Sequence, residues 1–188
     1  MIKRAIGLSA LVLGLSVASF GQSFEGSISG GLSKLSSKDI GSGYGLDDGF
    51  RLAFRITLNT GTFLGYEFGY AYNRSHLLLQ NVDQGGMAIH QGFGGVLLYA
   101  TKEGSRVRPF ATGGLHFSNF VPPGATAQYG QGENKFGFNY GGGVKIKVTG
   151  PWQVRFDVRQ YNQGKPFGLG AGGRLMLNEI SAGIGYQL

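Results

Sequence analysis

The residues of this chain best suited to chemistry are its three histidines, each of which has possible partners nearby. His76 directly follows Ser75, and Asp83 lies a short distance further along the same polar segment. A serine, a histidine and an aspartate can form a nucleophile, its base and the group that orients the base. Adjacent residues in one loop seldom hold that geometry, so the sequence favours a solvated loop over a catalytic set.

Two further groups of residues could bind a metal ion. We expect His90 and His116 on the inward faces of neighbouring strands, where both could reach one ion. No third ligand stands at a suitable spacing, which favours hydrogen-bonded interior histidines. Asp47 and Asp48, in a long loop, could contact a divalent cation that bridges lipopolysaccharide, or could be solvated. We predict no metal and no cofactor.

Glycine-rich segments and the absence of cysteine narrow the possible chemistry further. Gly92-Phe93-Gly94-Gly95 and Gly141-Gly142-Gly143 resemble phosphate loops, but no helix follows either segment. They fit close packing or bends in a curved sheet better. Without cysteine, the chain has no disulfide, thiolate metal site or cysteine nucleophile. The sequence therefore predicts a protein that is not an enzyme.

The composition fits a sheet with one face toward lipid. Glycine supplies 36 of 188 residues, whereas about 7% is usual. Aromatic residues reach 13% and charged residues only 14%, against roughly a quarter charged in ordinary soluble domains. The net charge of +7 is spread out, and no run of Lys and Arg exceeds two residues. Nucleic-acid binding, which needs a concentrated basic stripe, is not expected.

The N-terminal segment has the pattern of a Sec-type signal peptide. Lys3 and Arg4 precede an apolar stretch from Ala5 to Val17, and small residues follow. We expect cleavage after Gly21, with cleavage after Ser19 as the second choice. A membrane anchor is the alternative, but the apolar stretch is shorter than the ~20 residues that span a bilayer. Residues 1–21 are thus a predicted signal peptide, and residues 22–188 a predicted single domain.

The domain alternates apolar and polar residues with a period of two, which predicts β-strands. The pattern is clearest in the segment Phe50–Leu58, where Phe54 shares a face with every second residue. It recurs near 24–32, 63–72, 87–100, 107–120, 136–147, 152–159 and 179–188. Short connections at 59–61, 102–106 and 149–151 alternate with long ones at 33–49, 74–85, 121–134 and 162–173. The prediction is an all-β, eight-stranded antiparallel up-and-down transmembrane barrel with both termini in the periplasm.

The two faces of the predicted strands differ in chemistry. A soluble barrel would bury the aromatic face, whereas an outer-membrane barrel turns it toward lipid and lets glycine line a narrow interior. We favour the second arrangement. In the segment 87–100 we also expect Ile89, Phe93, Leu97 and Tyr99 outward, with Gln91 as an exception. The predicted lipid-facing residues are Phe54, Tyr66, Phe68, Tyr70, Phe138, Tyr140, Trp152, Phe156 and Tyr186.

The opposite face carries charges that would lie inside the barrel. An eight-stranded barrel is only wide enough for side chains to fill it, so we expect these charges to pair and to plug the interior. An ion or proton path is the alternative, and the excess of basic residues would make any leak favour anions. The predicted interior polar network consists of Glu25, Arg51, Arg55, Glu67, His90, Arg108, His116, Lys145, Arg155, Asp157, Arg159 and Glu179.

Several segments resemble a known family. Arg108–Gly114, Asn134–Gly143 and Trp152–Arg159, with the ending Ile184–Leu188, look like strands of the small OmpA/OmpX-type outer-membrane β-barrel superfamily. The resemblance implies a monomer in the Gram-negative outer membrane, in contact with lipid and lipopolysaccharide. It also implies assembly by the barrel-assembly machinery, which in this family recognises a terminal aromatic residue; this chain instead ends in Leu188, with Tyr186 two residues before it. The role it implies is structural, adhesive or surface-binding. A small-solute pore, a lipid-modifying enzyme and a soluble periplasmic barrel for an apolar ligand are the alternatives.

Overall fold

A computed structural model of the chain describes residues 23–36, 38–125, 131–169 and 172–188. The predicted signal peptide, residues 1–21, lies outside these ranges. No helix in the described ranges is long and apolar enough to cross a membrane. Apart from one turn of 3-10 helix, η3 (Pro166–Gly168), the regular structure described is β-sheet.

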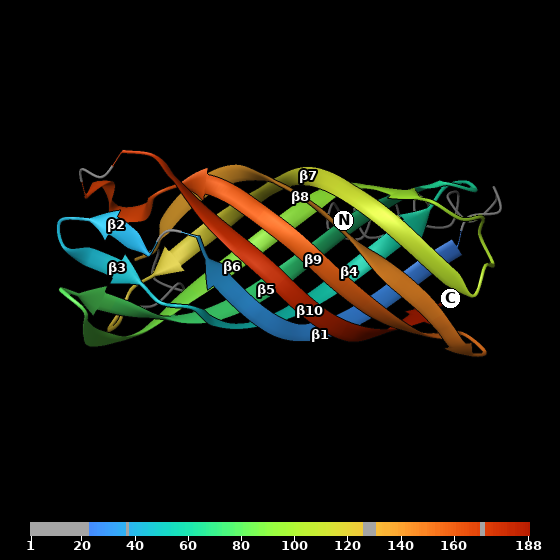
Figure 1. Ribbon diagram of the computed structural model, residues 1–188, viewed down its shortest axis with the longest axis horizontal. Coiled ribbons are helices and arrows are strands. Elements are labelled where there is room, and N and C mark those ends of the chain that lie inside the picture. Colours follow the sequence, from blue (N-terminus) through green and yellow to red (C-terminus); the bar gives the residue numbers. More distant parts are fainter. Residues whose placement is uncertain (1–22, 37, 126–130, 170–171) are drawn as a thin grey trace, which may run out of the picture.

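Eight long antiparallel strands close into a barrel, as Figure 1 shows. Closure comes from β1, which pairs with both β4 and β10, so that Ile28 lies opposite Phe54 on one side and Ile184 on the other. The predicted eight-stranded topology is confirmed. The barrel strands are β1 (Ser23–Leu35), β4 (Gly49–Asn59), β5 (Leu64–Leu79), β6 (Val82–Tyr99), β7 (Val107–Val121), β8 (Glu133–Thr149), β9 (Trp152–Gly164) and β10 (Arg174–Gln187).

The two ends of the barrel are built differently. At one end, which we call the turn end, short connections follow β4, β6 and β8. Both the first and last described strands also meet there, since the Leu188 amide donates a hydrogen bond to the Phe24 carbonyl. At the other end, which we call the loop end, the connections after β1, β7 and β9 are longer. The long connections of the chain are therefore gathered at the loop end.

One predicted loop, 74–85, is instead mostly strand. β5 continues to Leu79 and β6 begins at Val82, joined by a tight turn in which Gln80 and Asn81 have φ of 48° and 67°. Positive φ at both central residues is the hairpin geometry whose twist matches that of the strands. A small hairpin of β2 (Asp39–Gly41) and β3 (Tyr44–Leu46) adds to this extension, because β3 pairs with the last residues of β5. This pairing keeps a segment extended that the sequence alone presented as a polar loop.

The aromatic face of the sheet points outward. All nine predicted lipid-facing side chains lie on the outer surface, with exposed fractions from 38% for Phe138 to 62% for Phe68. A water-soluble barrel would pack these rings together in its centre. Here they form a continuous apolar surface around a polar interior, as a barrel in lipid requires.

The facing of β6 was predicted wrongly. Ile89, Gln91, Phe93 and Tyr99 all point inward, with exposed fractions of 7% or less, and His90 points outward opposite Tyr72 and Asn119. The inward rings fit because glycines on adjacent strands make room for them. A Cβ atom at Gly69, for example, would lie 2.3 Å from the Phe93 ring. Gln91, the one polar residue on the face expected to point outward, is fully buried and indicates the interior face of β6.

Candidate functional site

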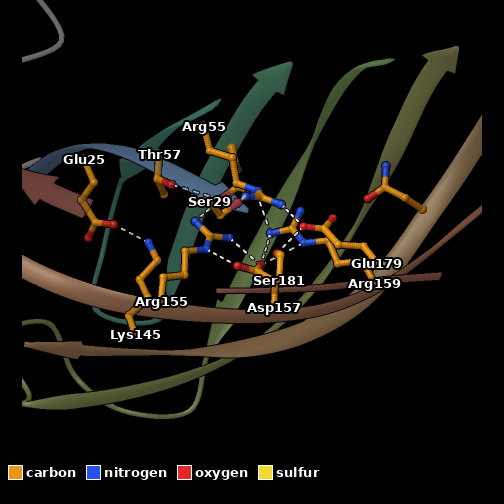
Figure 2. A network of polar contacts seen from close by, with 12 residues as sticks. Glu25, Ser29, Arg55, Thr57, Lys145, Arg155, Asp157, Arg159, Glu179 and Ser181 are labelled. Carbon is orange, nitrogen blue, oxygen red and sulfur yellow. Dashed lines mark hydrogen bonds and ion pairs between the residues drawn. The ribbon is translucent and has the colours of Figure 1, made fainter. Parts of the chain in front are cut away.

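The barrel interior holds ten buried charged side chains among the described residues. Because alternate residues of a strand share a face, Arg155, Asp157 and Arg159 of β9 all project into the lumen. Arg51 and Arg55 of β4 join them from across the barrel. Figure 2 shows part of this cluster, in which Arg55 pairs with Glu179 while Arg155 and Arg159 pair with Asp157.

Glu67 of β5 lies at the centre of the cluster. Its carboxylate is 2.5 Å from Arg155 Nη1 and 2.7 Å from Arg159 Nη2, with Arg55 Nε at 3.8 Å. Thr57 donates a further hydrogen bond of 3.2 Å to it. A buried carboxylate is stabilised by close charges of opposite sign, and Glu67 has three arginines within 4 Å of its oxygens.

Two other carboxylates complete the arginine network. Asp157 accepts a bidentate pair of hydrogen bonds from Arg155, 2.7 and 2.9 Å long, and lies 2.8 Å from Arg159 Nη2. Glu179 lies 3.1 Å from Arg51 Nε and also pairs with Arg55. Each carboxylate thus contacts at least two arginines, and the charges form one linked network.

The network fills the middle of the lumen. Arg51, Arg55, Glu67 and Glu179 are each 0–1% exposed, so this section of the lumen is filled by side chains. Taken over the described residues, the buried interior charges are six cations against four carboxylates, a net charge of two positive. The geometry of this section is that of a plug. The interior residues Glu25, Arg51, Arg55, Glu67, Arg108, His116, Lys145, Arg155, Asp157, Arg159 and Glu179 all lie inside the barrel, and His90 does not.

Apolar residues close the lumen above this network, at the loop end. Ile40 and Leu46 of the β2–β3 hairpin are fully buried against inward side chains of the barrel strands, including Met87 and Leu175. This cluster is not predicted by the sequence pattern, because its members come from a segment expected to be loop and from β6, whose expected facing is wrong. The signal available in the sequence was a set of scattered apolar residues, including Ile40 and Leu46, in an otherwise polar stretch.

The histidines do not form a metal site. His116 lies inside, 3.0 Å from Gln163 Oε1 and edge-on to the Tyr161 ring. His90 lies outside, where its Nδ1 is 2.5 Å from Tyr70 Oη. The barrel wall separates the two, so they cannot share an ion. Among the described residues, no group of three His, Cys, Asp or Glu side chains is arranged to hold a metal.

The Ser75, His76 and Asp83 set is also divided. His76 Nδ1 lies 2.9 Å from Asp83 Oδ2 on the outer side, with both side chains about half exposed. Ser75 is buried on the inner side and donates its hydroxyl to the Asp47 carbonyl. Adjacent residues of a strand face opposite ways, so His76 cannot activate Ser75.

The aspartates of the first long connection are engaged within the protein. Asp47 pairs with Lys38, and this hydrogen bond lowers the pKa of the Asp47 carboxyl below its ordinary value. Asp48 accepts a 2.9 Å hydrogen bond from the Leu35 amide. Both carboxylates therefore stabilise the loop end through contacts within the protein.

The chain is similar to known outer-membrane proteins in both sequence and fold. A family model described as "Outer membrane protein beta-barrel domain" matches residues 7–187. Among solved structures, Neisserial surface protein A is 15% identical, with a TM-score of 0.62 over 88% of this chain and 98% of that chain. The N-terminal β-barrel domain of Pseudomonas aeruginosa OprF is 12% identical, with a TM-score of 0.55 over 88% and 97%.

A third similar structure is Ail, the attachment invasion locus protein of Yersinia pestis, in complex with the heparin analogue sucrose octasulfate. It is 15% identical, with a TM-score of 0.56 over 89% of this chain and 99% of that chain. At these identities the likeness concerns the fold. No curated protein matches the sequence.

Proposed function

The chain belongs to the outer membrane protein beta-barrel domain family, and from this premise we propose that it is a closed barrel of the Gram-negative outer membrane with a structural and surface-binding role. The observation that carries the proposal is the filled lumen. Linked ion pairs occupy the middle and apolar side chains cover the loop end. A lumen of this kind contributes rigidity and leaves the loop end as the surface for recognition. The proposed orientation has the turn end in the periplasm and the loop end outside.

A non-enzymatic role fits the same geometry. The serine and histidine that could form a nucleophile and base lie on opposite sides of the barrel wall. A pore is the main alternative, and it requires a continuous water path. The fully buried charges of the network support the closed form.

The closed form predicts that the protein does not conduct ions. Purified barrel reconstituted into planar bilayers is expected to give no stable conductance above that of protein-free bilayers in concentrated salt. A porin added to the same bilayers serves as the positive control. Stable, anion-favouring steps would instead support the pore, because the interior carries an excess of positive charge.

Lipopolysaccharide is the proposed partner of the outer surface at the loop end. Lys34, Arg74 and Arg174 face outward there, at the lipid side of β1, β5 and β10. None of them is ion-paired with another described residue. Arg174 lies 5.0 Å from the centroid of the Phe138 ring, beside the aromatic surface. Unpaired cations at the outer edge of an apolar belt suit the phosphates of a lipid headgroup.

Removing these three charges is expected to weaken lipopolysaccharide binding. Each basic residue near an anionic surface contributes about 1 kcal/mol, so the triple variant Lys34→Gln, Arg74→Gln, Arg174→Gln should bind roughly a hundredfold more weakly at low salt. Titration of detergent-solubilised protein with labelled lipopolysaccharide measures the affinity.

A matched control is available at the same end. Lys38, Lys135 and Lys165 carry the same total charge but are paired with acids of the protein. Replacing all three by glutamine should leave most of the affinity intact. Equal losses in the two triple variants would show that net charge alone, and not the outward cations, attracts the lipid.

A further inference from the structure

A small recess at the turn end is lined by more basic than acidic groups. Its inner part is a cavity of about 10 Å³ with Arg108, Lys145, Lys147 and Gln153 among its walls. That is the space taken by about one water-sized group. An adjoining recess of about 190 Å³ shares Lys147 with it and adds Arg106. A ligand could therefore place one atom in the inner cavity while its remainder occupies the outer recess.

Arg108 is the unusual residue of this site. Its side chain is only 6% exposed, and its guanidinium carbon lies 3.7 Å from the centroid of the Tyr99 ring. No described residue accepts a hydrogen bond from its Nε or Nη2. Contact with the ring face leaves the N–H edge of a guanidinium available, and buried donors without an acceptor are costly.

The one carboxylate in the walls is already engaged. Glu25 pairs with Lys145, as Figure 2 shows, and accepts hydrogen bonds of 2.8 Å from Asn59 and 3.0 Å from Gln153. It is therefore not the partner that Arg108 lacks. Among described residues, Arg106, Arg108 and Lys147 form no ion pair, so the recess carries uncompensated positive charge.

We propose that this recess binds a single oxyanion of the phosphate or carboxylate class. One oxygen sits in the inner cavity against the guanidinium edge of Arg108, and the remaining oxygens extend toward Lys147 and Arg106. Arginine forms paired hydrogen bonds with such groups, and a lysine at the rim adds a mobile charge. The ligand is a free ion or the terminal phosphate or carboxylate of a larger molecule.

The proposal can be tested by NMR on the full folded chain in detergent micelles. Titration with inorganic phosphate at constant ionic strength is expected to shift the Arg108 Nε–Hε signal to saturation. Lys147→Gln and Arg106→Gln should each weaken this binding about tenfold or more, the size of one charge-assisted hydrogen bond. Lys102→Gln, which removes an exposed charge at the same end but outside the recess, should leave it unchanged.

Two results would overturn the site. One is a shift that rises linearly without saturating, and the other is equal affinity in the wild type and in Lys147→Gln. Arg108→Gln should abolish the binding, provided that heat-modifiable gel mobility shows a folded barrel. If Arg108→Gln does not fold, the affinities of Lys147→Gln and Arg106→Gln for phosphate test the site without it.

The source of the oxyanion is distinguished by the choice of probe. Methyl phosphate that binds as well as inorganic phosphate would indicate the end group of a larger molecule, since the outer recess then accommodates the substituent. Saturable binding of acetate would show that the recess also accepts carboxylates. Binding of inorganic phosphate alone would identify a free-ion site, and no saturable binding of any of the three would contradict the proposal.

Discussion

Replacing Glu67 by glutamine is expected to lower the free energy of unfolding by about 3–5 kcal/mol, the usual cost of breaking a buried ion pair. The change keeps the shape of the side chain and removes its charge. Arg155 and Arg159, which lie 2.5 and 2.7 Å from the carboxylate, would then share only Asp157. Urea unfolding in lipid vesicles, followed by fluorescence of the single tryptophan, measures the change.

Two further variants separate network pairing from the simple loss of a carboxylate. Asp83→Asn removes a carboxylate whose His76 partner is about half exposed, and it should have little effect on unfolding. Adding Arg159→Gln to Glu67→Gln should cost less than the sum of the single changes, by about 0.5–3 kcal/mol. Additive effects would show that the two side chains do not interact.

The wall of the barrel could be predicted from the sequence because most strands repeat the same alternation of apolar, lipid-facing residues and polar or small, lumen-facing residues. In β4 and β9, aromatic or aliphatic residues alternate with charged, polar or small ones. A shift by one residue would exchange the lipid-facing and lumen-facing side chains along the whole strand. Arg155, Asp157 and Arg159 were therefore placed inside by spacing alone. Their partners could not be assigned, because spacing within one strand does not say which strands face each other across the lumen.

β6 was misassigned because it is apolar on both faces. Leu97 and Leu98 are neighbours, one buried and the other 59% exposed, so alternation carries no signal there. The facing is decided by pairing with β5 and β7, which sets His90 opposite Tyr72 and Asn119. The register between β6 and its neighbours depends on the whole barrel and not on the sequence of β6 alone. Glycines on adjacent strands create the space for its inward side chains.

The apolar cluster at the loop end was hidden for a related reason. Ile40 and Leu46 belong to short strands that are stable only because β3 pairs with the extension of β5. Local sequence cannot reveal a three-residue strand whose partner lies about thirty residues further along the chain. The same limit applies to Arg108, whose lack of an acceptor depends on the neighbours that the closed barrel gives it.

The outward orientation of the aromatic face leads to the second large effect. Phe54 lies at the centre of β4 and is 47% exposed. If this face meets the hydrocarbon core, Phe54→Arg should lower the free energy of unfolding in vesicles by about 2–4 kcal/mol, because the charge is placed near the bilayer midplane. Phe136, 80% exposed near the loop end of β8, is the matched site, and Phe136→Arg should cost only about 0–1 kcal/mol.

The comparison of the two sites tests the membrane assignment directly. On a surface that faces water, an arginine in place of an exposed phenylalanine would cost little at either site, and the depth dependence would vanish. Equal, small effects of Phe54→Arg and Phe136→Arg would therefore contradict a lipid-facing belt. A large difference in unfolding free energy between the two variants would locate the hydrocarbon core along the barrel axis. The ion pairs of Glu67 and Asp157 with arginine would then lie inside the barrel at the level of that core.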